Sequence, residues 1–206
     1  MNITTLEVAG LSPAIYAMRN PMDSWMKCDS PREFGAKPGE FTVGPADKDL
    51  SIRLQKAGPE HCKHLRMIMV WANIDAPRYW WTEFDTYRYG VEKVSCSTMH
   101  KLMAKPLTED DFEIDDRASI GPKLTIDYLN SLMNEYKEEE DPVEKKAVWR
   151  HIIQNLPQSY LQKRTVMMSY AAIRNIYRQR EGHKLAEWQA FRKWAESLPE
   201  SWMITE

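Results

Sequence analysis

The residues best suited to chemistry lie in one short stretch of the sequence, from Phe84 to Lys101. Cys96 and His100 are four residues apart, a spacing at which the imidazole could serve as general base to a thiol nucleophile. A small, buried cysteine without a catalytic role is the commoner state of a lone thiol, and it is the interpretation that we favour for Cys96. Arg88 and Ser97 add a cation and a hydroxyl to the same stretch.

A second group consists of His61, Cys62 and His64. Residues three apart share a face of a helix, so His61 and His64 could together contact a metal ion. The remaining cysteines are distant in sequence, and a solvent-facing polar cluster at the end of a helix is the interpretation that we favour. We therefore predict no metal site.

Cations crowd the segment that follows residue 173: Arg174, Arg178, Arg180, His183 and Lys184. Positive side chains near the end of a helix interact favourably with its dipole, and this role alone can account for them. The alternative is a clamp for an anion, because a guanidinium can donate two parallel hydrogen bonds to a phosphate. The sequence leaves both interpretations open.

The composition excludes several classes of protein. The 206-residue chain has a net charge of −2 and a pI near 6.2, so we expect no binding to nucleic acid through a basic face. Three cysteines without framework spacing indicate reduced thiols. No apolar run approaches the roughly 18 residues of a membrane span, and residues 1–10 do not read as a secretory leader. We expect a cytoplasmic protein with no membrane partner.

Standard cofactor motifs are absent from the sequence: it has no glycine-rich dinucleotide fingerprint, phosphate loop or nucleophile elbow. A bound cofactor would therefore require a less common fold.

The first half of the chain predicts strands and helices in alternation. Residues 2–8 favour an edge strand, and a short helix with Ser12 as its cap and Pro13 in its first turn should follow. Residues 21–46 predict a long loop. We then expect an amphipathic helix over 47–57 ended by Gly58, a buried strand over 65–75, a helix from Pro77 to Gly90, and a loop over 91–101.

Beyond residue 122 the pattern is that of helices. We predict four of them, over 122–141, 142–156, 157–184 and 185–199, the third because its apolar residues mostly recur at helical spacing. The chain length suits a single domain, 1–206, with a sheet-containing part at 1–121 and a helical part at 122–206.

The segment from Leu156 to Arg180 resembles the flavin-dependent thymidylate synthase family. Anchored on Leu156 and Pro157, the spacing runs without a gap, and Tyr160, Asn175 and Arg180 fall on family positions. The resemblance implies an α/β (α+β) fold in which helices pack around a small twisted sheet, with a helical C-terminal portion.

The stretch from Phe84 to Lys101 resembles the signature loop of that family. Anchored on Pro77, Glu83 takes the place of a substrate-contacting Gln or Glu, and Arg88 takes the third signature position. A later signature serine corresponds to Ser97, or to Cys96 without a one-residue insertion.

The resemblance implies an enzyme that methylates C5 of dUMP, with methylenetetrahydrofolate as carbon donor, FAD as redox cofactor and NADPH as reductant. It implies that Arg180 is catalytic and binds substrate, and that Glu83, Arg88 and Ser97 bind the nucleotide. Asn175, His61 and Arg88 would bind the flavin. It also implies a homotetramer with sites between subunits.

Departures from the family pattern keep other functions open. Thr86 and Tyr87 replace an Arg and a His of the signature, and Ser169 and Ala171 replace an Asn and an Arg on the later helix. Losing such contacts would weaken binding unless other cations compensate; candidates are Arg66, Arg78, Lys93 and Lys101. The alternatives are a relative that modifies another pyrimidine nucleotide, as in a phage-like pathway, and a non-catalytic nucleotide-binding protein without FAD.

Overall fold

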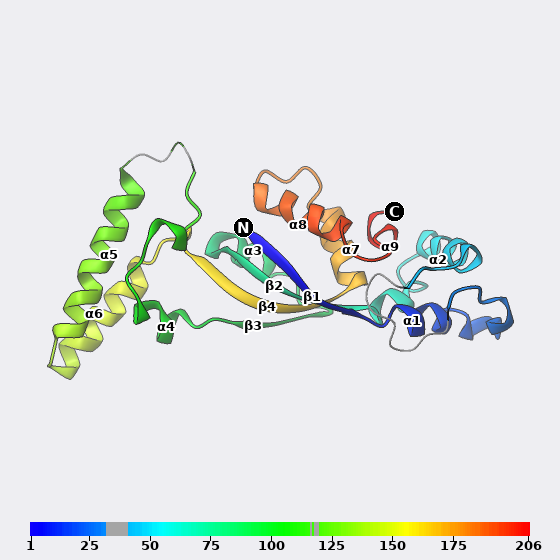
Figure 1. The fold of residues 1–206 in the computed structure, drawn as a ribbon, viewed down its shortest axis with the longest axis horizontal. Helices are drawn as coiled ribbons and strands as arrows, with labels where there is room; N and C mark the ends of the chain where they lie inside the picture. Colours follow the sequence, from blue (N-terminus) through cyan, green and yellow to red (C-terminus); the bar gives the residue numbers. More distant parts are fainter. Residues whose placement is uncertain (32–40, 116, 118–119) are drawn as a thin grey trace. The chain divides into compact units, whose positions relative to one another are not determined.

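The computed structural model of the chain describes residues 1–31, 41–115, 117 and 120–206 (Figure 1). The chain forms two compact units. Unit 1 comprises Met1–Asn2, Asp75–Thr86 and Ser95–Arg164, and unit 2 comprises Ile3–Ile74, Tyr87–Val94 and Thr165–Glu206. The single domain divided at residue 122 remains a prediction.

The described strands form a four-stranded sheet in the order β1-β2-β4-β3. Their bounds are β1 Asn2–Ala9, β2 Met69–Pro77, β3 Val91–Ser95 and β4 Leu161–Ser169. Tyr170 donates its N–H to Ile68 at the start of β2, and Arg78 donates to Tyr160 at the other end, so β2 and β4 are antiparallel. The edge strand predicted over residues 2–8 is confirmed.

β2 shows why the predicted strand forms. Every second residue is buried, including Val70, Ala72 and Ile74, so one face of the strand packs into a core while the other is half-buried. The strand begins four residues later than predicted, because Lys63–Arg66 form the 3-10 helix η3. The mixed α/β fold class is confirmed.

The long helix predicted over 157–184 is wrong. Its first part is the strand β4, and only Tyr170–Gln179 form a helix, α7. Val166 and Met168 are fully buried two residues apart, which is the period of a strand. Ser169 marks the change, since its Oγ accepts a hydrogen bond from the N–H of Ala172 and caps the helix.

Two further predictions around Gly90 need correction. The helix that begins after Pro77, α3 (Arg78–Phe84), ends well before Gly90. The segment 91–101, predicted as a loop, contains β3 and the short helix α4 (Thr98–Lys101). The sequence of β3 lacks alternation, and only Val91 is buried; pairing with β4 forms the strand.

Unit 2 contains α1 (Leu11–Ala17), α2 (Pro45–Ala57), α7, α8 (Ala186–Glu196) and α9 (Trp202–Thr205). α7 packs against α8, α9 and η3, and buries Tyr170, Ile173 and Ile176. The helix ended by Gly58 is confirmed. α1 starts at Leu11 after Gly10, so Ser12 lies inside it and is not its cap; its Oγ donates to the carbonyl of Pro31.

Of the loop predicted over 21–46, residues 32–40 lie outside the described part of the chain. The described remainder includes two short 3-10 helices, η1 (Asn20–Met22, which begins one residue before the loop) and η2 (Trp25–Lys27), and α2 begins at Pro45.

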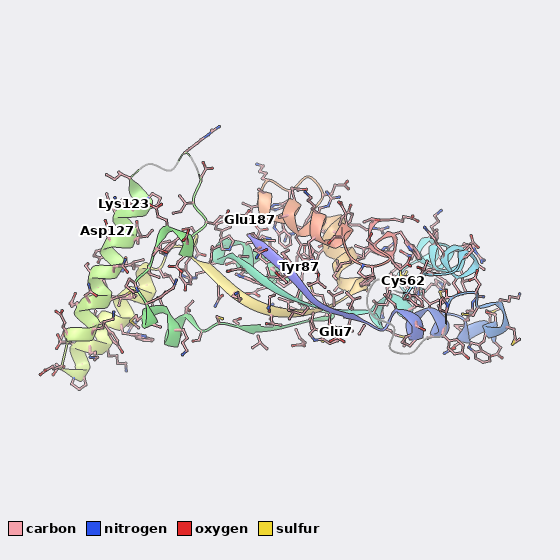
Figure 2. The ribbon with its side chains drawn as sticks, in the orientation of Figure 1. Glu7, Cys62, Tyr87, Lys123, Asp127 and Glu187 are labelled. Atoms are coloured by element: carbon pink, nitrogen blue, oxygen red, sulfur yellow. The ribbon has the colours of Figure 1, made fainter. Side chains whose placement is uncertain are left out.

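Unit 1 contains α3, α4, the 3-10 helices η4 (Leu102–Ala104) and η5 (Glu109–Asp111), and the helix pair α5 (Gly121–Glu138) and α6 (Pro142–Asn155). α5 packs against α6 over a core that includes Leu129, Met133 and Ile152. The exposed Lys123 and Asp127 project from α5 (Figure 2). No helix in the described ranges is long and apolar enough to cross a membrane.

Candidate functional site

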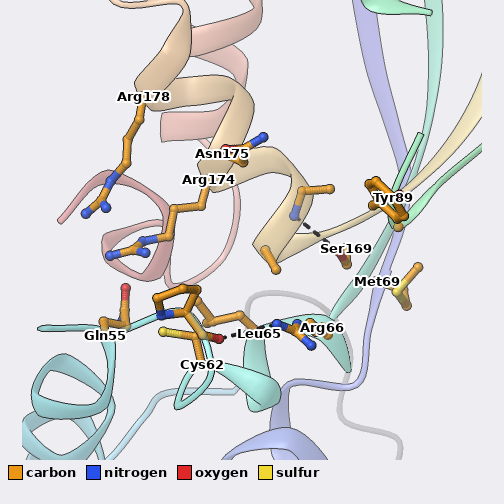
Figure 3. Close-up of a pocket in the computed structure, with 14 residues that line it drawn as sticks. Gln55, Cys62, Leu65, Arg66, Met69, Tyr89, Ser169, Arg174, Asn175 and Arg178 are labelled. Atoms are coloured by element: carbon orange, nitrogen blue, oxygen red, sulfur yellow. Dashed lines mark hydrogen bonds between the residues drawn. The ribbon is translucent and has the colours of Figure 1, made fainter. Parts of the chain in front are cut away.

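Unit 2 contains a cavity of about 850 Å³. Its wall is formed by α2, by the segment from Pro59 to Met69, by Tyr89 and Gly90, and by the first part of α7 with the preceding Ser169 (Figure 3). Small-molecule sites in proteins commonly enclose roughly 300–1,000 Å³, so this cavity is large enough for a cofactor or substrate.

A close approach between Gly90 and Ser169 positions the start of α7 in the wall. Ser169 donates its N–H to the carbonyl of Gly90, at 3.0 Å. Gly90 has a φ of 69°, and a Cβ at this position would lie 2.7 Å from the Ser169 Oγ. Glycine therefore meets both the backbone and the space requirement here, and the hydroxyl stays free to cap α7.

Three arginines give the cavity a positive potential. Arg174 and Arg178 come from α7, and Arg66 comes from η3. Figure 3 shows the Arg174 and Arg178 side chains leaving α7 on the same side. Within the described ranges, no Asp or Glu side chain forms an ion pair with any of the three.

Polar groups with no hydrogen-bond partner lie inside this wall. The Nε of Arg174 and the Oε1 of Gln55 are buried and contact no partner among the described residues. Burial, followed by the charge of Arg178, lowers the pKa of the Arg174 guanidinium. The cavity thus presents unused hydrogen-bonding capacity to a ligand.

His64 lies in η3, between two segments of the wall. Its Nε2 is 2.8 Å from the Ser51 Oγ, while its Nδ1 is buried without a partner among the described residues. Burial, with a smaller contribution from the charge of Arg174, lowers the pKa of His64 to about 4. The imidazole is therefore neutral near pH 7 and supports the wall through packing and one hydrogen bond.

Arg180 does not line the cavity; it lies at the end of α7 in an aromatic environment. Its Nε donates to the Tyr87 hydroxyl at 2.8 Å. Its guanidinium carbon lies 4.2 Å from the Trp188 ring centroid and 5.4 Å from that of Tyr87. These contacts orient the guanidinium by cation–π attraction and by one charged hydrogen bond.

The other predicted site residues divide between the units. Asn175 lines the cavity, His61 is exposed 3.6 Å from Glu60, and Arg88 is exposed between α3 and β3; these three belong to unit 2. Glu83, on α3, and Ser97, just before α4, belong to unit 1 and are half-buried. Of the six residues predicted for the site, Asn175 is the one in the wall.

The favoured interpretation of Cys96 as a buried thiol is wrong, because Cys96 is exposed. Its backbone pairs with β4 through the carbonyl of Lys163, at 2.9 Å, and this pairing leaves the side chain outside a core. The side chain of His100, its suggested base, lies outside the described residues. All three cysteines are free thiols.

The prediction of one solvent-facing cluster is wrong for His61, Cys62 and His64. His61 is exposed, whereas Cys62 and His64 are buried with different partners. The Cys62 thiol donates to the carbonyl of Gly58, at 3.3 Å. Among the residues described, no three potential metal ligands gather at one place.

Two residues that replace family positions lie in the wall, Ser169 and Ala171. Of the cations considered as compensators, Arg66 lies there too, whereas Arg78, in unit 1, donates its Nη1 to the carbonyl of Leu156 at 2.8 Å. Lys93 and Lys101 are not part of the wall.

No pattern in the sequence indicated that Gln55, Cys62 or Tyr89 would contribute to a cavity. The pair Arg174 and Arg178 was visible as two cations four residues apart, which on a helix share a face.

Comparison with solved structures identifies the fold. Two crystal structures of the flavin-dependent thymidylate synthase ThyX from Helicobacter pylori, both with FAD and dUMP, are similar to this chain at 17% sequence identity. One has a TM-score of 0.75 and the alignment covers 99% of this chain and 98% of that chain. The other has a TM-score of 0.72, with coverage of 99% and 97%.

Sequence comparisons add nothing to this likeness. No protein-family model matches the sequence, and a comparison with curated proteins finds no match. At this identity the structural likeness establishes a ThyX-like fold over the length of the chain.

Proposed function

We propose that this protein is a flavin-dependent thymidylate synthase-like enzyme, a divergent member of that family. It would methylate C5 of dUMP reductively, with methylenetetrahydrofolate as carbon donor and NADPH as reductant of FAD. The observation that carries the proposal is the electropositive cavity of about 850 Å³ beside α7, in a chain whose fold is similar to structures holding FAD and dUMP.

The residues of the cavity fit a flavin nucleotide in charge and in chemistry. Three guanidinium groups that pair with no Asp or Glu side chain among the described residues suit phosphate oxygens. Asn175, in the wall, supplies an amide that can hydrogen-bond a flavin ring, and the exposed ring of Tyr89 offers a flat apolar surface. Bound FAD would supply the hydride; the protein would supply position and charge.

The remaining roles are carried over from the family resemblance as proposals. Arg180 would stabilise negative charge on the uracil ring, with Tyr87 and Trp188 holding its guanidinium in place. Glu83, Ser97 and Arg88 would bind the nucleotide, and His61 and Arg88 the flavin. A homotetramer with sites between subunits would not require all of these residues to meet within one chain.

A test of the enzyme uses the purified protein with FAD, NADPH, methylenetetrahydrofolate and dUMP labelled with tritium at C5. We expect a flavin absorbance band that coelutes with the protein, and FAD-dependent release of tritium. Protein that stays colourless after FAD is added would contradict the proposal. Light scattering on the same fractions measures the oligomeric state.

A second candidate function is nucleotide binding without catalysis. The observation that favours it is the Tyr87 hydroxyl, which accepts the hydrogen bond of the proposed catalytic Arg180 at a position where the family signature has a histidine. In that case dUMP should bind without tritium release, whether or not FAD is present. Flavin binding without release would leave a third outcome, a flavoenzyme that acts on another pyrimidine nucleotide.

A further inference from the structure

Arg174 and Arg178 converge on a single oxygen. Both donate from their Nη2 atoms to the main-chain oxygen of Glu206, at 3.1 and 2.5 Å. The two residues are one helical turn apart, where like charges repel each other. The pair is therefore already arranged around the position of one acceptor oxygen.

Arg66 lines the same cavity from η3. Burial raises the pKa of the Cys62 thiol, while the charges of Arg174, Arg178 and Arg66 act to lower it. Cys62 lies in the cavity wall together with all three arginines. Arg66 itself donates only to the carbonyl of Pro59, at 3.3 Å, among the described residues.

Most of the donors of this arginine cluster, Arg66, Arg174 and Arg178, are unused. A guanidinium has five N–H groups, and each of the three makes one hydrogen bond to the residues described. The Nε of Arg174 is also buried. Burying an unpaired donor and placing like charges together both cost stability, and an anion bound between them would remove both costs.

The form of the cavity indicates a ligand larger than a simple anion. Its volume of about 850 Å³ is near the upper end of the usual range for small-molecule sites. Beside the cluster, Leu65, Met69 and Ala171 give the wall an apolar part. A ligand with an anionic middle and flat apolar rings fits this combination.

We propose that the arginine cluster of Arg66, Arg174 and Arg178 binds the diphosphate group of FAD. The inference rests on the proposed function and adds to it which residues recognise the cofactor and through which group. Arginine suits this role, because its planar fork contacts two phosphate oxygens at once. The cluster would replace the cation that the family resemblance leads us to expect at Ala171, one helical turn before Arg174.

The test compares FAD with riboflavin, which lacks both the diphosphate and the adenosine attached to it. FAD and riboflavin are titrated into the parent protein, Arg174→Gln, Arg178→Gln and Arg66→Gln, with flavin fluorescence as the readout. We expect each variant to bind FAD roughly 10- to 100-fold more weakly than the parent, because one charged hydrogen-bonding group is lost. Each variant should bind riboflavin with the same affinity as the parent. Arg66 is exposed, so its variant tests the inference even if a change on α7 impairs folding.

Arg53→Gln is the matched control. Arg53 is exposed on α2, pairs with Asp49 at 2.9 Å and does not line the cavity, so the substitution removes one positive charge elsewhere in the same unit. It should leave FAD affinity within about twofold of the parent value, as expected for an exposed pair. Thermal unfolding of every variant checks that the fold is retained.

The outcomes separate this inference from the proposed function. A parent protein that binds neither flavin overturns both. FAD binding that is equally tight in the parent and the three variants overturns the arginine cluster and leaves the flavoenzyme standing. An equal loss of FAD and riboflavin affinity would also overturn it, and so would a loss of dUMP affinity by calorimetry with FAD affinity retained, since the cluster would then bind a monophosphate.

Discussion

His64 should make the folded state sensitive to acid in a narrow pH range. Its pKa is about 4 in the folded protein against 6.5 for an ordinary histidine, so the unfolded chain binds a proton that the folded chain excludes. A protonated ring would also place an N–H on Nδ1, which has no acceptor among the described residues. Stability is therefore unaffected by His64 above pH 6.5 and falls as the pH drops from 6.5 towards 4.

The size of the effect follows from the two pKa values. At 1.36 kcal/mol per pH unit, the interval from 6.5 to about 4 corresponds to a total loss of about 3 kcal/mol. Between pH 7.5 and 4.5 the loss is about 2.5 kcal/mol, because protonation of the folded state begins to limit it near pH 4. Such a loss is a large share of the typical stability of a domain.

The assay is urea unfolding at pH 7.5 and 4.5, followed by tryptophan fluorescence. His64→Gln keeps an amide near the Ser51 Oγ, the partner of the imidazole, but cannot be protonated. His61→Gln is the control, because His61 is exposed. The parent and the control should each lose about 2.5 kcal/mol more than His64→Gln does. The same loss in all three proteins would refute the reasoning.

Two further predictions concern backbone strain and a buried ion pair. Gly90→Ala places a non-glycine residue at φ 69° with its Cβ 2.7 Å from the Ser169 Oγ, whereas Gly182→Ala meets no atom within 4 Å at φ 65°. Both should cost about 1–2 kcal/mol for the backbone. Gly90→Ala should lower Tm further, and equal decreases would show that the contact is unimportant. Asp47→Asn leaves the buried Arg19, 5% exposed, without a negatively charged partner. We expect a loss of about 3–5 kcal/mol in urea unfolding, and a loss below about 1 kcal/mol would contradict it.

The sequence predicted those helices and strands whose ends are marked by local residues. The helix that ends before Gly58 and the strand that runs to Pro77 were found, because glycine and proline mark their ends. β4 was missed, since an apolar run such as Val166–Met168 fits a helix as well as a strand over a few residues. Its strand form depends on pairing with β2 and β3, which lie far away in sequence.

The candidate site was predictable only in part, for the same reason. The family resemblance pointed to Asn175, and the charge pattern pointed to Arg174, Arg178 and, as a compensator, Arg66; all four line the cavity. The contact between Arg180 and Tyr87 joins residues 93 positions apart, and no local pattern indicates it. Sequence reasoning thus found the helix that carries the cations but not the segments that face it.

The cavity is assembled from all three chain segments of unit 2, and this has a consequence for how the protein folds. The chain leaves the unit at Ile74, returns for Tyr87–Val94, and enters it for the last time at Thr165. Closing such long loops is slow, so the wall contributed by α7 should form late, after the intervening chain has been made. A ligand can then bind only the completed unit. At a concentration 100 times its Kd, the ligand would add about 2.7 kcal/mol to the free energy of unfolding. Increased resistance to heat and proteolysis in the presence of ligand would therefore indicate that the cavity has formed.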